Sequence, residues 1–531
     1  MMPPKRSFLT PRESGLGLRR VTNAAGLDFS VLPNGCVFAL EHEQGQSRTV
    51  LSQVLGSPLG GGIMRILVRT GGADPSIIEA AGPRAKVNFG AAADRFVWEG
   101  EAQGFRHCVT LWLHPSEALW LWRVDVENTS GAAFPCDAIF IQDLGLGPRG
   151  FVMNNEAYAS QYIDHMVPTH PRFGPVVMSR QNMAQDNRHP WTAHGCFDGA
   201  ASFATDALQL FGPAYRDANE IELPFGASLP GVRLQHECAC AILQSESRIL
   251  QPGESTAWTF FGVYDPDHAE PTGENDLSRI EAAEQAAKAF AKEDVALETP
   301  VRSLLQDASP LLCRSASEDA RPRIHEERQD GELLSYFVED GPRNRHAVLR
   351  EKDRLVRRRH GTIIRSGQDF LPSDDTLCTT AWMHGVFASQ LTIGNTSFHK
   401  LFSVSRDGYN ITRGSGLRVL AEIDGAWRLL TLPSRFEMGL SDCLWEYRHE
   451  GGTISVHVLA SGEDPALQCT IEVEGAPCRF LVFGHLVLGE QDFAHSGIVE
   501  VDGVAKRLSF RPDPDWLWGQ RYPDAVYHLV T

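Results

Sequence analysis

The sequence lacks several features that identify common classes of protein. None of its apolar runs reaches the about 18–20 residues that a membrane-spanning helix needs. A basic excess is also missing, because 67 acidic residues outnumber 49 basic residues and the formal net charge is −18. Nucleic acids and anionic membranes attract basic surfaces. We therefore expect neither of them as a main partner.

The eleven cysteines show no spacing typical of a metal site. Their number is odd, and no second cysteine or histidine pair accompanies Cys238 and Cys240. We expect buried thiols, no metal and no cofactor. The N-terminal residues include basic side chains but no apolar stretch after them, so they do not resemble a secretory signal. Together these features predict a cytoplasmic protein.

The common catalytic motifs are absent as well. No GxSxG, HExxH or phosphate-binding loop occurs, and Gly60–Gly62 lacks the lysine and hydroxyl residue of such a loop. Asp164 and His165 have two interpretations, a base with its orienting partner or a structural pair beside a loop. The adjacent acids Asp374 and Asp375 lie in a turn-like context and are expected to be solvated. We predict no catalytic residue in this chain.

The clearest positive signal is a strand–turn–strand pattern that continues to about residue 265. The Asn34–Gly35 dipeptide lies between two apolar runs, which is typical of a β-hairpin turn. Leucine alternates with tryptophan over Leu119–Trp122, so both faces of this strand are apolar. A strand with two apolar faces is covered on both sides. We predict an N-terminal antiparallel β-sandwich over residues 1–270.

A helix is expected next, over residues 275–294. Ser278 and Glu281 have the spacing of a capping box near its start. The charged sequence that follows leads us to assign residues 271–360 to a helical, charged linker. The helix carries one apolar stripe at intervals of three to four residues, made of Leu277, Ile280, Ala283, Ala287 and Phe290.

Short β-rich segments return from about residue 361, separated by glycine, aspartate and asparagine turns. Asp424–Gly425 and Gly451–Gly452 have the composition of hairpin turns. These segments predict a second antiparallel sandwich over residues 361–531. The fold class is therefore all-β, with two antiparallel sandwiches and a few linker helices.

The run from Asn155 to Trp191 combines aromatic, amide, histidine and arginine side chains with few aliphatic ones. Aromatic rings stack on the apolar faces of sugar rings, and amides bond their hydroxyls. Packing of the sandwich loops or of an interdomain contact is the alternative role. As stacking residues we predict Tyr158, Tyr162 and Trp191, and as hydroxyl-binding residues Asn155, Gln161, Arg180, Gln181 and His189.

The chain resembles glycoside hydrolase family 94, whose members are inverting phosphorylases of β-glucosidic bonds. The resemblance lies in NEAYASQYIDH, SRQNM, HPWTAHGCFDGA and LFGPAYRDANEIELP, and later in CTTAWMHGVFASQLTIGNTSFHKLFSVSRDGYN. It is greatest to the 1,2-β-oligoglucan phosphorylase branch, with kinship to the phosphorylase-like part of cyclic β-1,2-glucan synthases. The matching runs extend from about Asp143 to Arg418.

The resemblance implies a galactose-mutarotase-like supersandwich in the second half of the chain. It also implies a catalytic (α/α)6 barrel in cis, which supplies a general acid and binds inorganic phosphate as co-substrate. No paired-helix pattern of barrel length follows residue 361, so we expect an N-terminal portion without this barrel. In such enzymes the supersandwich loops contact the barrel and can help to shape its substrate cleft. Sugar binding and packing are therefore the two alternative roles of a second cluster, made of Trp382, His384, Gln390, Asn395 and His399.

Three hypotheses of different kinds follow. The first is a carbohydrate-binding and supporting region of an inverting phosphorylase of β-1,2-glucooligosaccharides, which also contributes to a homodimer. The second is a stand-alone carbohydrate-binding protein without catalysis. A third is an epimerase, because mutarotase-like sandwiches can carry that activity, but fold alone is poor evidence for function.

Overall fold

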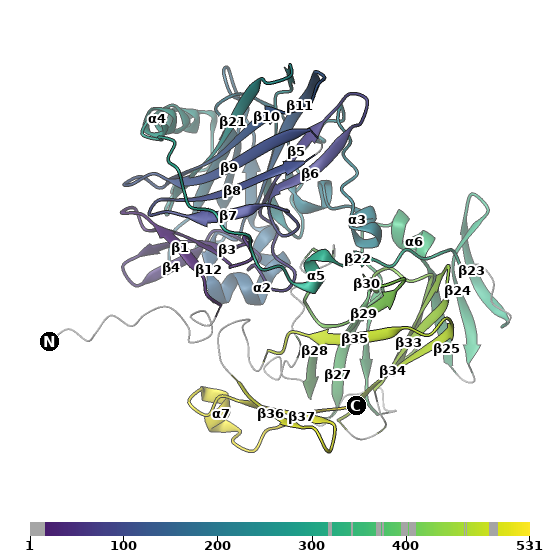
Figure 1. Cartoon of the computed structure of the whole chain (residues 1–531). Coiled ribbons are helices and arrows are strands. Elements are labelled where there is room, and N and C mark those ends of the chain that lie inside the picture. The colour runs from purple at the N-terminus through teal and green to yellow at the C-terminus, as the bar shows by residue number, and fades with distance from the viewer. Residues whose placement is uncertain are drawn as a thin grey trace. The chain divides into compact units, whose positions relative to one another are not determined.

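A computed structural model provides the structure of the chain, and its described residues form two compact units (Figure 1). The N-terminal unit comprises Gly17–Gly212 and Ile221–Asp307, and the C-terminal unit includes Pro213–Glu220 and Ala308–Thr531. The described residues are 16–102, 104–316, 321–340, 343–367, 373, 376–393, 402, 410–411, 413–460, 462, 465–487 and 497–531.

The N-terminal unit is built from three main antiparallel sheets. The largest contains, in spatial order, β13 (Ile163–Met166), β16 (Val177–Gln181), β17 (Trp191–Cys196), β21 (Ser255–Asp265), β10 (Leu119–Asn128), β9 (Phe105–Leu113), β8 (Arg95–Ala102) and β7 (Asn88–Ala91). A second contains β18 (Ala200–Asp206), β19 (Ala239–Ser245), β11 (Phe134–Asp143), β5 (Arg65–Thr70) and β6 (Ser76–Ala81), with β20 (Arg248–Leu250) paired to β11. The third contains β1 (Arg19–Thr22), β2 (Leu27–Val31), β3 (Val37–Gln44), β4 (Ser47–Val50) and β12 (Gly147–Pro148), and β14 (Thr169–His170) pairs separately with β15 (Gly174–Pro175).

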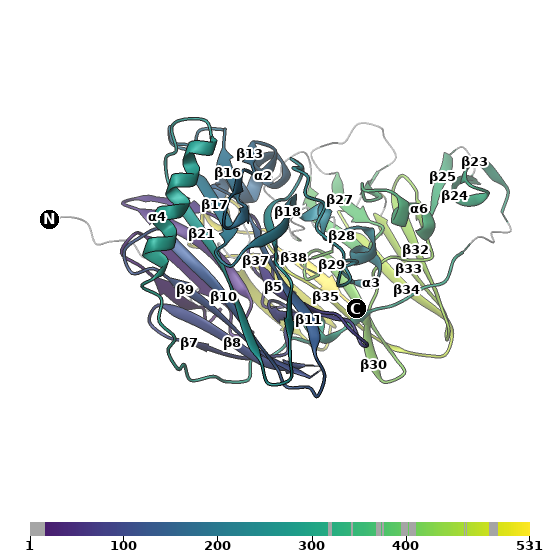
Figure 2. The same ribbon diagram turned by 90° about the horizontal axis from the view of Figure 1, so that it is seen from above.

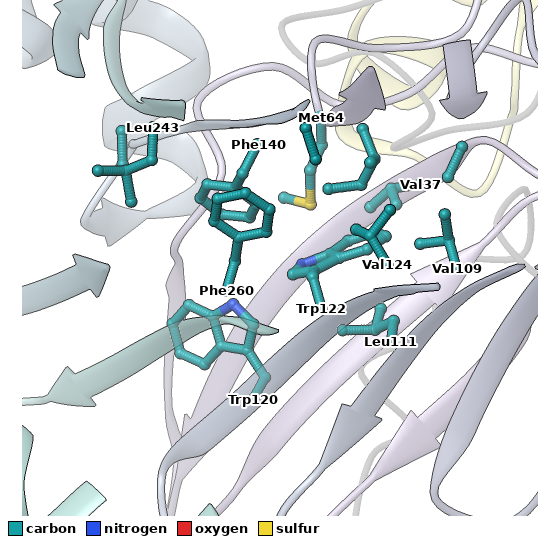
Figure 3. Close-up of a cluster of buried hydrophobic side chains, with 14 of the residues drawn as sticks. Val37, Met64, Val109, Leu111, Trp120, Trp122, Val124, Phe140, Leu243 and Phe260 are labelled. Atoms are coloured by element: carbon teal, nitrogen blue, oxygen red, sulfur yellow. The ribbon is translucent and has the colours of Figure 1, made fainter. Parts of the chain in front are cut away.

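The main core of this unit is a layer of large aromatic side chains between the sheets (Figure 3). Trp98 and Trp122 stack with ring centroids 5.4 Å apart, and Phe140 stacks on Phe260 at 5.6 Å. The indole N–H of Trp120 donates to the amide oxygen of Gln142 at 3.1 Å, so this buried donor is satisfied. Alternating side chains of β9 and β10 therefore form one wall of the core.

The opposite face of β9 and β10 is also covered, as the alternation predicts. Leu119 and Leu121 belong to a second buried cluster together with Ile280 and Ala283 of α4 (Leu277–Ala287). Figure 2 shows α4 lying along this sheet. The predicted apolar stripe is thus confirmed, but the capping box is not formed, because the Ser278 hydroxyl donates to the Asn275 carbonyl oxygen at 2.8 Å.

The interpretation of the first 265 residues as strands and turns alone missed a helix, α2 (Arg149–Gln161). Its sequence has only a weak apolar stripe, because asparagine, tyrosine and glutamine occupy much of its surface. The remaining helical turns of this unit are short. They are η1 (Ala207–Gln209), η2 (Glu274–Asp276) and α5 (Leu304–Asp307). Among the described residues, no helix has both the length and the hydropathy to cross a membrane.

The C-terminal unit contains two larger sheets and a small one. The first has the order β22 (Ser309–Pro310), β30 (Ala426–Leu429), β29 (Leu417–Ile423), β28 (Val386–Ile393), β27 (Leu377–Trp382) and β26 (Gly361–Arg365), with β35 (Arg479–Gly484) paired to β29. The second has the order β23 (Arg323–Gln329), β24 (Glu332–Asp340), β25 (Arg343–Leu349), β31 (Arg435–Met438), β32 (Asp442–His449), β33 (Gly452–Ala460) and β34 (Leu467–Gly475). The third consists of β36 (Gly497–Asp502), β37 (Arg507–Pro512) and β38 (Tyr527–Val530), and the helices are α3 (Pro213–Ala218), α6 (Arg350–Leu355) and α7 (Leu517–Arg521).

The hairpins expected in both sandwiches are present. Residues Asp424 and Gly425 connect β29 to β30 with φ of 52° and 73°, the left-handed conformation that two-residue hairpins need. Gly452 begins β33, which pairs with β32. The cores of the two larger sheets meet in one cluster that includes Phe387, Phe436 and Trp445. The all-β class with two antiparallel sandwiches is confirmed.

The predicted linker over residues 271–360 is wrong in two respects. Its first part contains α4, which packs on the N-terminal sandwich. Its later part contains β23, β24 and β25, which belong to the seven-stranded sheet of the C-terminal unit. Most side chains of β23 are exposed and charged. A strand without an apolar face gives no period-two signal, which explains why the sequence pattern did not identify it.

A short segment of the chain joins the C-terminal unit through buried ion pairs. The carboxylate of Asp217 in α3 accepts two hydrogen bonds from Nη2 of Arg350, at 2.7 and 2.6 Å. Arg216 lies 3.2 Å from the Asp353 carboxylate and also donates to the Asp353 carbonyl oxygen at 2.9 Å. All four side chains are buried. These crossed pairs attach Pro213–Glu220 to α6.

Replacing Asp217 with alanine leaves Arg350 charged and buried without its carboxylate. We expect Asp217→Ala to lower the free energy of unfolding by about 3–5 kcal/mol, measured by equilibrium urea unfolding. The control is Arg479→Ala, which removes an exposed ion pair with Glu422 in the same unit and is expected to change little. Equal effects of the two substitutions would contradict this role for Asp217.

Burial of His194 makes the stability of the N-terminal unit depend on pH. Its ring stacks on Phe140, and desolvation lowers its pKa from 6.5 to about 3. As the pH falls, His194 is protonated in the unfolded chain at a higher pH than in the folded chain. The stability that neutral His194 contributes is therefore complete above the unfolded pKa and is lost as the pH falls below it. When the pH falls from about 6.5 to 5, we expect the free energy of unfolding of the wild type to decrease by about 2 kcal/mol more than that of His194→Phe. Urea unfolding at the two pH values measures this, and parallel pH profiles would show that His194 does not titrate this way.

Candidate functional site

The predicted carbohydrate-binding residues of the N-terminal unit begin on α2. Tyr158 and Tyr162 are four residues apart, and their hydroxyl oxygens are 2.8 Å apart. Their rings meet edge to face with centroids 4.9 Å apart, and 46% of Tyr158 is exposed. This hydrogen bond raises the pKa of Tyr162 above its ordinary value, so the Tyr162 phenol stays neutral at physiological pH. The pair offers aromatic surface and hydroxyls to solvent.

The other two residues of this group on α2 differ in what they can offer. The Asn155 amide donates to the Phe151 carbonyl oxygen one turn earlier, at 2.8 Å, so one of its donors is used within the helix. Gln161 is exposed at the end of α2 beside Tyr162. A ligand on this surface would therefore meet Tyr158, Gln161 and Tyr162 together.

Arg180 and Gln181, on β16, are committed to internal contacts. The Arg180 guanidinium donates to the carbonyl oxygens of His268 at 2.9 Å and Ala269 at 3.1 Å. The Gln181 amide donates to the Ala159 carbonyl oxygen at 3.2 Å, which ties β16 to α2. Both side chains are buried. Neither is therefore part of the exposed surface, and Gln181 is the one that contacts α2.

Trp191 is fully buried and His189 is half-buried. The Trp191 ring stacks on His268 at 5.1 Å, with the Arg279 guanidinium 5.5 Å from its centroid. Because none of its surface is exposed, Trp191 cannot stack on a sugar in this conformation, contrary to the expected role. His189 donates through Nδ1 to the Gln181 carbonyl oxygen at 3.0 Å, which leaves Nε2 as an acceptor in the neutral ring.

A small hollow lies beside these residues. It is lined by His42 and Thr49 on one side and by Gln185, Asp186 and Arg188 on the other. Its volume is about 10 Å³, which is the room that one water molecule needs. A sugar ring does not fit inside it. Of the predicted residues of this unit, those on the exposed α2 surface are therefore the ones that remain open to solvent.

The second predicted cluster lies in the C-terminal unit. Trp382 and His384 have ring centroids 6.5 Å apart, and the Arg359 guanidinium lies 4.6 Å from the Trp382 centroid. His384 is buried, whereas Trp382 and Gln390 are half-buried. Trp382 is thus already covered in part by a cation. Asn395 and His399 lie outside the described residues, as do Asp374 and Asp375.

The structure does not join Asp164 and His165 as an acid–base pair. The two residues are consecutive on β13, so their side chains point to opposite faces. Asp164 is exposed, whereas His165 is buried and its Nδ1 lies 2.9 Å from the Ser179 hydroxyl. Burial lowers the pKa of His165 to about 4. The structural pair beside a loop is not formed either, because the His165 side chain contacts Ser179 instead of Asp164.

No group of metal-ligating side chains is present in the part of the chain that the structure describes. Cys238 and Cys240 are both buried, and the pKa of each thiol is raised. Burial is the largest cause for Cys240, and a hydrogen bond with Cys240 for Cys238. Both are therefore protonated thiols that fill the core.

Sequence reasoning missed a polar group in the C-terminal unit, made of Arg345, Glu437, Asp442 and His457. These residues come from four strands and are linked by hydrogen bonds. The available signal was the alternation of polar and apolar residues in β32 and β33. That alternation shows which face a residue occupies, but not which other strands lie beside it.

Two protein-family models match the two halves of the chain. Residues 30–262 match the family described as SOGP N-terminal domain, and residues 321–531 match the glycoside phosphorylase supersandwich domain. A 1,2-beta-oligoglucan phosphorylase of Listeria innocua serovar 6a is 30% identical over 497 residues. The alignment covers 91% of this chain and 44% of that protein, so the chain spans less than half of this relative.

Solved structures show weaker similarity. A bacterial glucoamylase bound to acarbose is 9% identical with a TM-score of 0.29, over 51% of this chain and 36% of its own. A galactose mutarotase related enzyme from Lactobacillus acidophilus is 8% identical with a TM-score of 0.23, over 48% of this chain and 100% of its own. Similarity at this level supports no statement about activity.

The contrast between Trp191 and Tyr158 is testable through stability. We expect Trp191→Ala to lower the free energy of unfolding by about 3–5 kcal/mol, because it leaves a large cavity. The exposed Tyr158→Phe variant removes one hydroxyl and should unfold almost as the wild type does. Urea unfolding of both variants provides the measurement, and a Trp191→Ala variant of wild-type stability would contradict the packing described above.

Proposed function

Because the chain belongs to the glycoside phosphorylase family that carries an SOGP N-terminal domain and a supersandwich domain, we propose that it is the carbohydrate-binding and supporting region of an inverting phosphorylase of β-1,2-glucooligosaccharides. The observation that carries this proposal is the similarity to the Listeria innocua 1,2-beta-oligoglucan phosphorylase across both units. The order of the two matched domains along the chain supports it further.

The chemistry of the proposed reaction sets what this region contributes. Inverting phosphorolysis needs one protonated carboxyl group for the leaving oxygen, and phosphate replaces the water and second carboxylate of a hydrolase. Within the described residues we identify no carboxyl group placed for this role. We therefore assign the acid and the phosphate-binding groups to a catalytic barrel in cis, and to this chain the binding and support of the glucan.

The exposed α2 surface is the proposed glucan contact of the N-terminal unit. Tyr158 supplies an open aromatic face, and Tyr162 and Gln161 supply hydrogen-bonding groups beside it. Gln181 ties this surface to β16 through its hydrogen bond to the Ala159 carbonyl oxygen. The second cluster around Trp382 is proposed to shape the same enzyme's substrate cleft. We also propose that the enzyme forms a homodimer and is located in the cytoplasm.

A stand-alone carbohydrate-binding protein is the second candidate function. It is favoured by the same exposed tyrosine pair, since aromatic surface of this kind binds sugars without catalysis. The two candidates differ in activity rather than in affinity.

The first experiment measures phosphate release from glucose 1-phosphate with sophorose as acceptor. It compares this chain with the longer protein that is obtained when translation of the same reading frame is extended beyond Thr531. We expect activity only in the longer product, because the proposed acid and phosphate site are not in this chain. Activity of neither protein would favour the stand-alone binding protein.

A second experiment tests the α2 surface by calorimetry with β-1,2-glucooligosaccharides. We expect Tyr158→Ala to weaken binding about tenfold, the loss of one stacking contact of about 1.4 kcal/mol. The exposed Tyr522, on the C-terminal unit, provides the matched control as Tyr522→Ala. Unchanged affinity of Tyr158→Ala would remove α2 from the binding surface.

A further inference from the structure

The seven-stranded sheet of the C-terminal unit has one apolar and one polar face. Ile454, Val456 and Val458 of β33 face the core, so the alternate residues Ser455 and His457 face away from it. The pairing register places His457 opposite Leu444 on β32 and opposite Thr470 on β34. Side chains from adjacent strands thus form a row across the polar face.

A network of hydrogen-bonded charges holds this row at one end. Arg345 donates from Nε to the Glu437 carboxylate at 2.5 Å and from Nη1 to the Asp442 carboxylate at 2.7 Å. Arg321 donates to Glu437 as well, at 2.6 and 3.1 Å. Glu437 is almost fully buried. Because each carboxylate is bound by an arginine, the network is rigid and internally compensated.

Asp442 also orients His457. The Asp442 Oδ2 atom lies 2.7 Å from Nε2 of His457. Burial opposes ionisation of Asp442, but hydrogen bonds from His457 and Arg345 outweigh it and lower its pKa to about 2. A carboxylate accepts, so Nε2 donates to Asp442 and Nδ1 is the ring nitrogen that is directed elsewhere. The His457 side chain is 43% exposed, which leaves Nδ1 within reach of a ligand.

These residues line a hollow of about 380 Å³. That volume falls in the range of small-molecule sites, whereas the hollow of the N-terminal unit holds one water. Leu444 forms an apolar patch in its floor, and Ser455, Thr470 and Glu472 add hydroxyl and carboxylate groups on the adjoining strands. Donors, acceptors and one apolar patch therefore converge in a space large enough for a sugar ring.

We propose that this hollow is a binding site for one or two sugar units of a neutral saccharide. Glu472, Thr470 and Nδ1 of His457 receive or donate the hydroxyl hydrogen bonds, and Leu444 packs against the C–H face of the ring. The choice of a β-1,2-linked glucan as ligand rests on the proposed function. The site itself rests on the hollow and its lining.

The lining distinguishes a neutral polyol from charged ligands. Four acidic side chains face two arginines, so an anion such as phosphate meets net negative charge. Both arginines are bound to carboxylates of the lining itself. A metal ion is disfavoured as well, since among the described residues no group of ligating side chains is arranged for one. Hydroxyl groups both donate and accept, which matches this mixed lining.

The test is titration of the chain with sophorose, followed by ligand-observed NMR and calorimetry. We expect Glu472→Ala and His457→Ala each to weaken binding about tenfold, the loss of one hydrogen bond to a charged or oriented group. The matched control is Glu474→Ala, which removes the same side chain two residues along the same face of β34 and outside the hollow. Thr470→Ala provides a second, milder variant that leaves the ion pairs intact.

Two results would overturn the site. One is sophorose binding that neither Glu472→Ala nor His457→Ala changes, and the other is the absence of sophorose binding at millimolar ligand. Loss of affinity in Glu474→Ala equal to that in Glu472→Ala would also contradict it, because it would reflect surface charge alone. The phosphorylase assay of the longer product is read separately, so failure of this site leaves the proposed function to its own test.

Discussion

Both faces of β10 are apolar over Leu119–Trp122, and this constraint organises the N-terminal unit. One face must be covered by the other sheets, which is where the tryptophan and phenylalanine layer forms. The other face must be covered too, and α4 lies there with Ile280 and Ala283 in contact with the sheet residues. Since apolar area on this scale contributes roughly 25 cal/mol per Å² removed from water, neither face can stay open.

The same requirement decides which candidate side chains reach solvent. The strands that carry Arg180, Gln181 and Trp191 belong to the doubly covered sheet, so these side chains are enclosed and satisfy backbone carbonyls or pack against His268. Tyr158 and Tyr162 lie on a helix outside that sheet, and their rings remain accessible. A polar and aromatic composition thus marks this region of the sequence, and burial separates its enclosed side chains from those exposed to solvent.

In the C-terminal unit, by contrast, the seven-stranded sheet buries one face and leaves a polar face built from ion pairs and hydroxyls. The crossed pairs of Arg216 with Asp353 and of Asp217 with Arg350 attach a segment from far earlier in the chain. Buried pairs of this kind contribute to specificity of association more than to net stability.

The sequence by itself determined the class of the fold. Period-two alternation, the Asn-Gly and Asp-Gly turns and the stripe of α4 are local signals, and the structure contains all of them. The motif runs also indicated the phosphorylase family. Local signals do not specify α2 or β23, because the first has little apolar stripe and the second has no apolar face.

Only the tertiary structure decided which side chains meet. Arg345, Glu437, Asp442 and His457 are separated by up to 112 positions, yet strand pairing brings them into one network. Trp191 is of a residue type expected to stack on sugars, but the packing of β17 against its neighbours buries it. Register and burial depend on contacts between distant segments, which is the physical reason that residue types alone could not place the site.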